Sequence, residues 1–373
     1  MILSYTFSLI LLTQIALLIW LYWCGTIVRN RQKEYVFNSC ETNDIDVIIA
    51  AKENSDIIIR TLKSLQHLEV NKIILALDHP SPCLLQKVSV FLSDYPQVTL
   101  VTNTDLPGKI NTQKKAFINS DAKNILLIDS DITIAIDQIE FEKMYAMFVL
   151  NKCDFLCPYS FGIYKQGNLW ERIVECDRIM RQQIIRAGRD YYGVSNLSGY
   201  CLLAKRDSYL DVIESNCLQD DVVASINLIT KKYKVNTYHK VVCGELERFT
   251  FYKMLMQRVR WTAGNLLIFW RYCQIFKLDY RKAIVFLASF HFWYGALYVD
   301  FLAMICSRNR FIILYCLTIE IILKTVLLSV RAHGIYNITT CFAYSIIWPS
   351  YSILALCGVI PFLLFRLEKE SRR

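Results

Sequence analysis

The chain has 373 residues, enough for one sizeable core and additional segments. Hydrophobic residues make up 54% of it and the mean hydropathy is +0.30, which excludes a wholly soluble chain. Much of the net charge of +9 lies in the two tails and around residues 253–281, beside apolar stretches. This placement indicates anionic lipid headgroups as the charged partner, and no basic groove with interleaved aromatic residues points to nucleic acid.

The chain begins with an apolar stretch. Residues 3–24 carry no charge and are long enough to span a hydrocarbon layer of roughly 30 Å. The basic residues Arg29, Arg31 and Lys33 follow this stretch rather than precede it, which favours a retained anchor over a cleaved signal peptide. We predict a transmembrane anchor over residues 1–28 whose downstream side faces the cytoplasm.

Residues 40–250 alternate short apolar runs with amphipathic stretches, and the pattern is that of one α/β domain. It predicts strands at 45–50, 71–78, 98–102 and 124–131, with helices at 54–68 and 84–95. Strand and helix in alternation are typical of a parallel sheet, in which ligands bind beyond the carboxyl ends of the strands. Two of these strands end in carboxylates, at Asp78 and at Asp129 with Asp131.

The acidic residues of this domain are candidate site residues. Asp129 and Asp131, separated by one serine after a strand, can hold a divalent cation against a nucleotide diphosphate. Aspartates also form turns after strands, so the pair alone decides little. Asp220 and Asp221 begin a stretch with helical spacing, which suits either a general base or helix capping. Gly199, in a loop before a short strand, lets the backbone approach a ligand closely.

Apolar stretches return after about residue 283. The stretches 283–306, 311–330 and 337–365 predict about three transmembrane or re-entrant segments, followed by a basic tail at 366–373. In the second stretch Glu320 and Lys324 are four residues apart, which predicts an internal ion pair.

The sequence LMQRVRWTAG (255–264) lies between the domain and these stretches, within residues 251–282. Arg258, Arg260 and Trp261 suit an anchor at the membrane interface, and the same residues suit one part of an active site. We predict interfacial helices over residues 251–282.

Taken together, these stretches resemble the membrane-bound inverting glycosyltransferases of family 2, and most closely the ceramide glucosyltransferase-like family. That pattern is an aspartate, a DxD pair, a third acidic site and Q/R-x-x-R-W, which here are Asp78, Asp129-Ser130-Asp131, Asp220-Asp221 and Gln257-Arg258-Val259-Arg260-Trp261. Three further stretches match, namely VIIAAKENSDIIIRTLKSL, which contains Glu53, PGKINTQKKAF, which contains Lys109 and Asn111, and SGYCLLAKRD, which resembles the acceptor-side loop and strand. The resemblance covers residues 44–265 and the flanking membrane segments.

The resemblance implies a fold and a location. The fold is an α/β, Rossmann-like nucleotide-sugar-binding domain of the GT-A type, with transmembrane helices on its N- and C-terminal sides. The protein would be a multi-pass integral membrane protein whose catalytic domain faces the cytoplasm.

The resemblance also implies roles for single residues. A UDP-sugar donor would be bound by Asp78, Glu53, Lys109, Asn111 and Asp129, and Mg²⁺ or Mn²⁺ by Asp129 and Asp131. Asp221, with Asp220 beside it, would be the general base of a single inverting displacement. The remaining catalytic residues would be Gln257, Arg258, Arg260 and Trp261, with Arg258 or Arg260 stabilising the departing diphosphate.

The resemblance to ceramide glucosyltransferases is weaker in the residues near the acceptor. Ceramide glucosyltransferases carry a histidine before the acceptor loop, whereas residues 177–190 contain none, so the expected acceptor is a lipid of ceramide or another type. Processive synthases of cellulose, chitin or hyaluronan share Q-x-x-R-W and are one alternative, although about four membrane segments are few for a polysaccharide channel. A non-enzymatic membrane protein is a second alternative. The presence of all three acidic sites argues against it, because a degenerate enzyme would be expected to have lost one of them. The oligomeric state and the identity of the hexose stay open.

Overall fold

The structure, a computed structural model, describes residues 2–34, 40–52, 54–163, 167–215, 217, 219–246, 250–268, 271, 282, 285, 310–332, 338–359 and 361–362. It divides into two units. The sheet unit comprises Gln32–Ile163 and Ser195–Glu247. The helical unit comprises Met1–Arg31, Tyr164–Val194 and Arg248–Arg373. Residues 164–194, which the sequence pattern placed inside the 40–250 domain, therefore group with helices from both ends of the chain.

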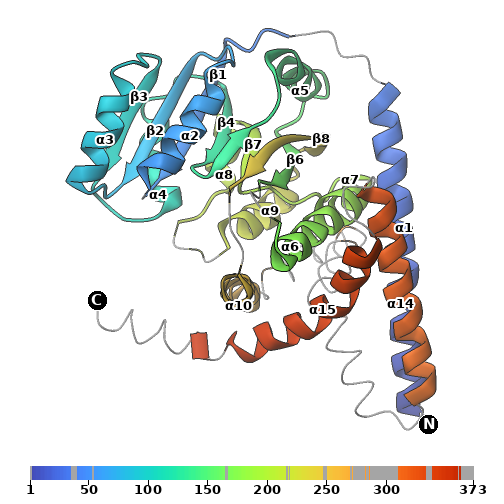
Figure 1. Cartoon of the computed structure of the whole chain (residues 1–373). Helices are drawn as coiled ribbons and strands as arrows, with labels where there is room; N and C mark the ends of the chain where they lie inside the picture. The colour runs from blue at the N-terminus through green and yellow to red at the C-terminus, as the bar shows by residue number, and fades with distance from the viewer. Residues whose placement is uncertain are drawn as a thin grey trace. The chain divides into compact units, whose positions relative to one another are not determined.

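Within the described residues, the sheet unit contains one mixed sheet of eight strands in the order β3-β2-β1-β4-β7-β6-β8-β5 (Figure 1). The first four strands in this order are parallel, as predicted: β3 (Val98–Asn103), β2 (Lys72–Asp78), β1 (Ile45–Ala51) and β4 (Asn124–Asp129). The other four complete a mixed half: β7 (Cys201–Lys205), β6 (Phe155–Gly162), β8 (Val235–Glu245) and β5 (Ile132–Ile134). Of these, the sequence pattern had indicated the short strand β7.

Both faces of the parallel half are covered by helices. Alternate residues of β1 point to opposite faces, and Ile45, Val47 and Ile49 pack into one core. That core includes residues of three helices, α2 (Ser55–Leu65), α3 (Pro82–Leu92) and α5 (Gln138–Leu150). Ile48 is fully buried on the opposite face, where α4 (Lys109–Phe117) contacts β1, β2 and β3. Burial on both faces explains why these strands are apolar throughout.

The predicted helices begin at residues that can cap them. The side chain of Asn54 accepts a hydrogen bond from the Ile57 amide at 3.3 Å at the start of α2. Ser81 does the same for Leu84 at 3.2 Å before Pro82, the first residue of α3. Two further helices of the sheet unit, α8 (Arg206–Val212) and α9 (Asp220–Thr230), follow β7.

The helical unit combines helices that are far apart in the sequence: α1 (Ile2–Glu34), α6 (Leu169–Ile179), α7 (Ala187–Asp190), α10 (Phe251–Leu267), α14 (Arg310–Arg331) and α15 (Ile338–Cys357). A π-helical segment, η1 (Met180–Arg186), joins α6 to α7. α14 and α15 correspond to the predicted stretches 311–330 and 337–365, and all of 283–306 except residue 285 lies outside the described residues. The predicted ion pair between Glu320 and Lys324 is present in α14.

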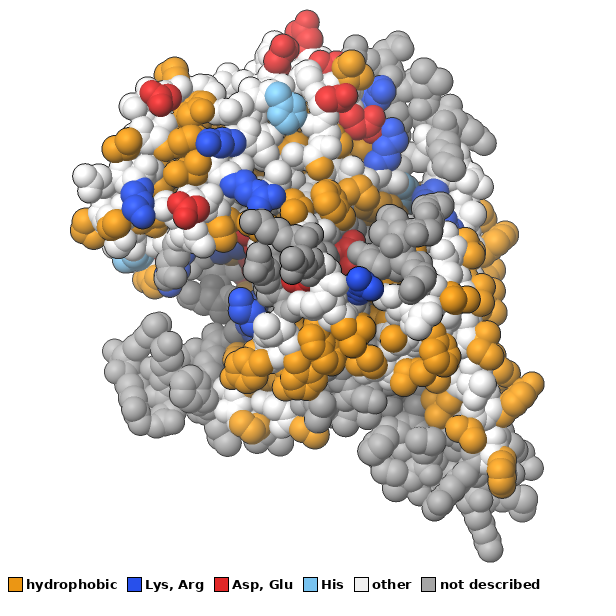
Figure 2. All heavy atoms as spheres, in the orientation of Figure 1, with side chains coloured by type: hydrophobic (Ala, Val, Ile, Leu, Met, Phe, Trp, Pro, Cys, Tyr) orange, Lys and Arg blue, Asp and Glu red, His pale blue; other side chains and the backbone are white. Residues whose placement is uncertain are grey.

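Among the described residues, one segment is long and apolar enough to cross a membrane, Leu12–Gln32 of α1. Large apolar side chains are exposed along it, including Ile19, Trp20 and Trp23. In the view of Figure 2, hydrophobic side chains gather over the helical unit, whereas charged side chains are more frequent over the sheet unit.

Small residues let α1 approach α7 closely. A Cβ built on Gly188 would lie 2.6 Å from the carbonyl oxygen of Leu21, and one built on Gly25 would lie 2.8 Å from the Cβ of Ala187. Because Leu21 presents a backbone atom to Gly188, a methyl group there can fit only if a helix moves.

Gly188→Ala is therefore expected to lower the stability of the helical unit by about 2 kcal/mol, the usual effect of overpacking, and the melting temperature by about 5 °C. Thermal unfolding of the detergent-solubilised protein measures this shift. Gly167→Ala is the matched control, since the nearest atom to its Cβ would be the Nε of Arg172 at 3.6 Å. An unchanged melting temperature in Gly188→Ala would show that α1 and α7 do not pack in this way.

Candidate active site

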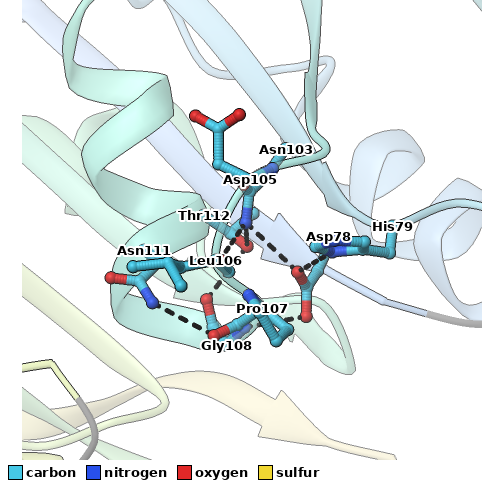
Figure 3. A network of polar contacts seen from close by, with 9 residues as sticks. All are labelled: Asp78, His79, Asn103, Asp105, Leu106, Pro107, Gly108, Asn111 and Thr112. Carbon is cyan, nitrogen blue, oxygen red and sulfur yellow. Dashed lines mark hydrogen bonds and ion pairs between the residues drawn. The ribbon is translucent and has the colours of Figure 1, made fainter.

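The end of β2 carries a buried carboxylate that organises the next loop. Asp78 is 5% exposed, and its Oδ2 accepts a hydrogen bond from the Gly108 amide at 3.1 Å. Its Oδ1 accepts one from Asn103 Nδ2 at 3.2 Å and lies 3.0 Å from Nδ1 of His79. Asn103 Nδ2 also donates to the carbonyl of Leu106 at 2.8 Å, so the loop is closed on itself (Figure 3).

This network fixes the start of α4. Gly108, the residue before the helix, has φ +119°, a conformation that side-chain-bearing residues rarely adopt. Burial raises the pKa of Asp78, but hydrogen bonds from His79 and the Gly108 amide outweigh it and hold the pKa below its ordinary value. The carboxylate is thus kept ionised where it holds the loop that leads to Lys109.

Asp78→Asn is expected to destabilise the protein by about 2 kcal/mol at pH 7, because a carboxylate acceptor of several hydrogen bonds is lost. Since the folded-state pKa is depressed, this stabilisation is complete above the unfolded pKa of about 3.9 and is lost as the pH falls through the folded pKa. The melting temperatures of the two proteins should therefore differ at pH 7, begin to converge below about pH 4 and meet only below the folded-state pKa of Asp78.

The matched control is Asp105→Asn. Asp105 lies in the same loop, but its side chain is 62% exposed and pairs with Lys115 at the surface. Asp105→Asn should leave the melting temperature nearly unchanged. An Asp78→Asn protein that melts like this control would contradict the anchoring role of Asp78.

Lys109, the first residue of α4, joins two strand ends. Its Nζ lies 2.6 Å from Oδ1 of Asp129, the last residue of β4, and donates to the carbonyl of Gly199 at 3.1 Å. Asn111, two residues further along, donates to the carbonyl of Pro107 at 3.1 Å.

Asp220 and Asp221 form the first turn of α9, where the helix dipole favours negative charge. A Cβ built on Gly199 would lie 2.2 Å from Oδ2 of Asp221, so the carboxylate lies directly against this glycine. Ser225 fastens the loop to the helix, because its Oγ accepts from the Leu197 amide at 2.9 Å and donates to the carbonyl of Asp221 at 2.5 Å.

A pocket in the sheet unit brings these residues together. Its lining comes from α4, β4, the loop before β7, α8 and α9, and consists of Lys109, Ile110, Gln113, Leu127, Leu197, Ser198, Gly199, Leu202, Tyr209, Ile213, Asp220, Asp221 and Ala224. Three predicted site residues, Lys109, Asp220 and Asp221, therefore share one pocket. Tyr209 and Gln113, which the sequence did not reveal, are joined inside it by a hydrogen bond of 2.9 Å.

The charges at this pocket are strongly coupled. Burial opposes the charged form of Lys109, but the carboxylates of Asp129, Asp221 and Asp220 hold its pKa well above the ordinary value. Burial raises the pKa of Asp129, Lys109 opposes this effect, and Asp220 and Glu245 raise it further. Glu245 ends β8 in register with Ile132 of β5, directly after the D-x-D sequence, and no motif had marked it.

Asp129 and Asp131 flank the turn between β4 and β5. Within the described part of the chain, no group of three or more histidine, cysteine or acidic side chains is arranged to hold a metal ion. Mg²⁺ and Mn²⁺ commonly bind one or two carboxylates together with substrate phosphates, so two are sufficient. The repulsion of Asp129 by Asp220 and Glu245 shows an excess of negative charge, which a divalent cation would offset. The residues present fit such an ion.

The Q-x-x-R-W residues lie on α10, in the helical unit. Arg258 is 2% exposed, and its Nη2 lies 2.7 Å from Oδ2 of Asp177 in α6. The Arg258 guanidinium also lies 4.1 Å from the ring centre of Trp261. Arg260 is exposed and Gln257 is partly buried, so the two arginines of the motif have different surroundings. Glu53, the remaining predicted site residue, lies outside the described residues.

The chain resembles known glycosyltransferases. The family model for glycosyl transferase family group 2 matches residues 124–366, which is more than half of the chain. The chain is 24% identical over 294 residues to the probable glycosyltransferase YdaM of Bacillus subtilis (strain 168), covering 74% of this chain and 67% of that protein.

The fold also has a solved counterpart. It resembles mannosyltransferase PcManGT from Pyrobaculum calidifontis, solved in complex with GDP-Man and Mn²⁺, with a TM-score of 0.64 at 12% identity over 96% of this chain and 99% of that one. The predicted Rossmann-like α/β fold of the GT-A type is confirmed. The match to the family model establishes what the motifs suggested: this chain is a glycosyltransferase and belongs to glycosyl transferase family group 2.

Proposed function

We propose that the protein transfers a hexose from a UDP-sugar to a lipid acceptor by a single inverting displacement at the cytoplasmic face of a membrane. The observation that carries this proposal is the pocket in which Lys109 and Gly199 meet Asp220 and Asp221, next to Asp129. It combines a cation for a phosphate group with carboxylates for a divalent ion and for a proton.

Asp221 is the residue to which we assign the general base. Its carboxylate lies against Gly199 in the pocket wall, whereas the carboxylate of Asp129 is paired with Lys109. The proton of the acceptor hydroxyl passes to Asp221 while the hydroxyl oxygen attacks the anomeric carbon. The nucleotide diphosphate leaves from the opposite face, so an α-linked donor gives a β-glycoside. Asp220 adds negative charge in the same turn of α9.

The donor side is assigned to the ends of β2 and β4. Asp129 and Asp131 would hold Mg²⁺ or Mn²⁺, which supplies positive charge against the departing diphosphate when it is bound. Lys109 is placed to bind a phosphate oxygen, because it is charged and lies beside Asp129 at the start of α4. Asp78 acts on the donor through the loop that it holds, and Asn111 and Glu53 complete the proposed set.

Features of the helical unit support a lipid acceptor. Leu12–Gln32 is long and apolar enough to cross a membrane. α10 exposes Phe251, Tyr252 and Met256 together with Lys253, a combination that suits a helix lying in the membrane interface. The Q-x-x-R-W residues are on this same helix, which would keep them near a membrane-bound acceptor. Residues 283–365 would supply the remaining membrane segments.

The test is a donor screen with protein purified in detergent. UDP-glucose, UDP-galactose, UDP-N-acetylglucosamine and GDP-mannose are each supplied with a membrane lipid extract, and nucleotide release is measured with Mg²⁺, Mn²⁺ or EDTA. We expect release from one UDP-hexose that requires both lipid and divalent ion. Nucleotide release from GDP-mannose alone would overturn the assignment of a uridine donor. Activity in the presence of EDTA would overturn the proposed metal requirement. If none of the four donors releases its nucleotide, the proposed function is wrong.

A further inference from the structure

One buried carboxylate of the helical unit connects four helical segments. Asp177 of α6 has no exposed surface, and its Oδ2 lies 2.7 Å from Arg258 Nη2 and 3.2 Å from Arg181 Nε. Its Oδ1 accepts a hydrogen bond of 3.3 Å from the hydroxyl of Tyr344 in α15. Arg258 belongs to α10, so α6, η1, α10 and α15 meet at this one side chain.

Both arginines bound by Asp177 lie over the indole of Trp261. The guanidinium carbon is 4.1 Å from the ring centre for Arg258 and 5.2 Å for Arg181. These distances are within the range of cation–π contacts, which depend on the placement of the cation over the ring. A shift of the Asp177 carboxylate would therefore move the two groups that define the orientation of Trp261.

Fold stability alone does not require this arrangement. A buried ion pair is often no more stabilising than apolar residues of similar volume, because both charges lose their hydration. The helix is also irregular directly after Asp177, since the π-helical segment η1 begins at Met180. The side chain of Arg29 in α1 donates to the carbonyl of Gln183 within that segment. π-helical turns are rare and frequently lie at functional sites.

We propose that Asp177 is a positioning residue for the Q-x-x-R-W motif, acting through Arg258 and Arg181 to hold the indole of Trp261 in its working orientation. Arg258 is then committed to Asp177, and Arg260, on the exposed side of α10, is the motif arginine available to substrate. This assignment rests on the proposed function, because it takes the motif to be part of the transfer machinery.

The test compares Asp177→Asn with Glu175→Gln. Glu175 lies on the same helix and forms a similarly buried pair with Arg178 at 3.1 Å, whereas the cation–π contacts that the proposal invokes are those of Arg258 and Arg181. Hydroxyl-radical labelling of Trp261 reports its shielding without any substrate. Transfer from the UDP-sugar to lipid extract reports its function, and binding of UDP with Mn²⁺ reports the donor site in the sheet unit.

We expect Asp177→Asn to increase the labelling of Trp261 and to lower kcat/KM of transfer about 30-fold, within the loss that a misplacement of about 1 Å can cause, with UDP affinity unchanged. Glu175→Gln should leave the labelling of Trp261, the transfer rate and the UDP affinity unchanged. Equal labelling and transfer in both variants would overturn the proposal. A parallel loss of UDP binding would show general unfolding of Asp177→Asn, and the milder variant described next then decides. A wild-type protein that binds no UDP would overturn the proposed function, and the labelling result would then decide the role of Asp177 by itself.

Asp177→Asn leaves a buried arginine partly uncompensated and can prevent folding, so a milder variant is included. Tyr344→Phe keeps every charge and removes the hydroxyl that donates the 3.3 Å hydrogen bond to Asp177. It should increase Trp261 labelling and lower transfer about fivefold, in line with the loss of one hydrogen bond. Unchanged labelling and transfer in this variant would contradict the proposal.

Discussion

Asp221→Asn is expected to lower the rate of sugar transfer by about a thousandfold, within the range that a general base contributes. The amide keeps the shape of the carboxylate, so the fit against Gly199 is preserved while the capacity to accept a proton is lost. Binding of UDP with Mn²⁺ should change little, because our proposal assigns Asp221 to the acceptor hydroxyl and the donor to the ends of β2 and β4. Initial rates at saturating donor and lipid measure the effect.

Asp211→Asn is the control for this variant. Asp211 lies in α8 of the same unit, where it pairs with Lys231 at 2.7 Å and accepts a hydrogen bond from Tyr233 at 2.8 Å at the surface. The Asp211→Asn substitution removes a carboxylate that does not line the pocket, so this variant should transfer sugar at the wild-type rate. Retained activity in Asp221→Asn would move the base to another residue, with Asp220 the next candidate.

Gly199→Ala is expected to lower kcat about a hundredfold, because it would displace the proposed base. The new methyl carbon would lie 2.2 Å from Oδ2 and 2.8 Å from Cγ of Asp221, well inside van der Waals contact. Asp221 has a short side chain that can rotate away, so the protein should fold and bind UDP while the carboxylate is misplaced. A displacement of about 1 Å at a reacting group is sufficient for a loss of this size.

A double-mutant cycle separates this mechanism from general damage. In an Asp221→Ala background no carboxylate is present to collide with the methyl group, so Gly199→Ala should cause little further loss of activity. The two losses should therefore be strongly non-additive. If Gly199→Ala lowers the residual rate by the same factor in both backgrounds, it acts through something other than Asp221, such as the carbonyl that accepts from Lys109.

The parallel half of the fold was predictable because its local pattern is unambiguous. Strands buried on both faces are apolar throughout, and Asp78 and Asp129 mark where β2 and β4 end. The arrangement of the mixed half could not be predicted, because the pairing of β7 with β4 and of β8 with β5 depends on contacts between residues that are distant in sequence. For the same reason Glu245 was missed, because only the register of β8 brings it beside the D-x-D turn.

In α10, which carries the Q-x-x-R-W residues, helical spacing indicates which side chains are buried. Met254, Arg258 and Thr262 are four residues apart and all buried, so helical spacing alone places Arg258 on the inner face of α10. Arg260 is two residues further along and exposed. Asp177 gives no comparable signal, because a single aspartate in an amphipathic helix is ordinarily at the surface. Its partner in α10 is known only from the fold.

The fate of a radiolabelled sugar tests the central claim most directly. Membranes containing the wild-type protein or Asp221→Asn are incubated with the UDP-hexose selected by the donor screen, and the products are extracted with organic solvent. We predict that the label enters the organic phase on a lipid bearing one β-linked sugar, and that it does so only with the wild-type protein. Label recovered as an ethanol-insoluble polymer, or in the organic phase with Asp221→Asn as well, would contradict a single inverting transfer that depends on Asp221.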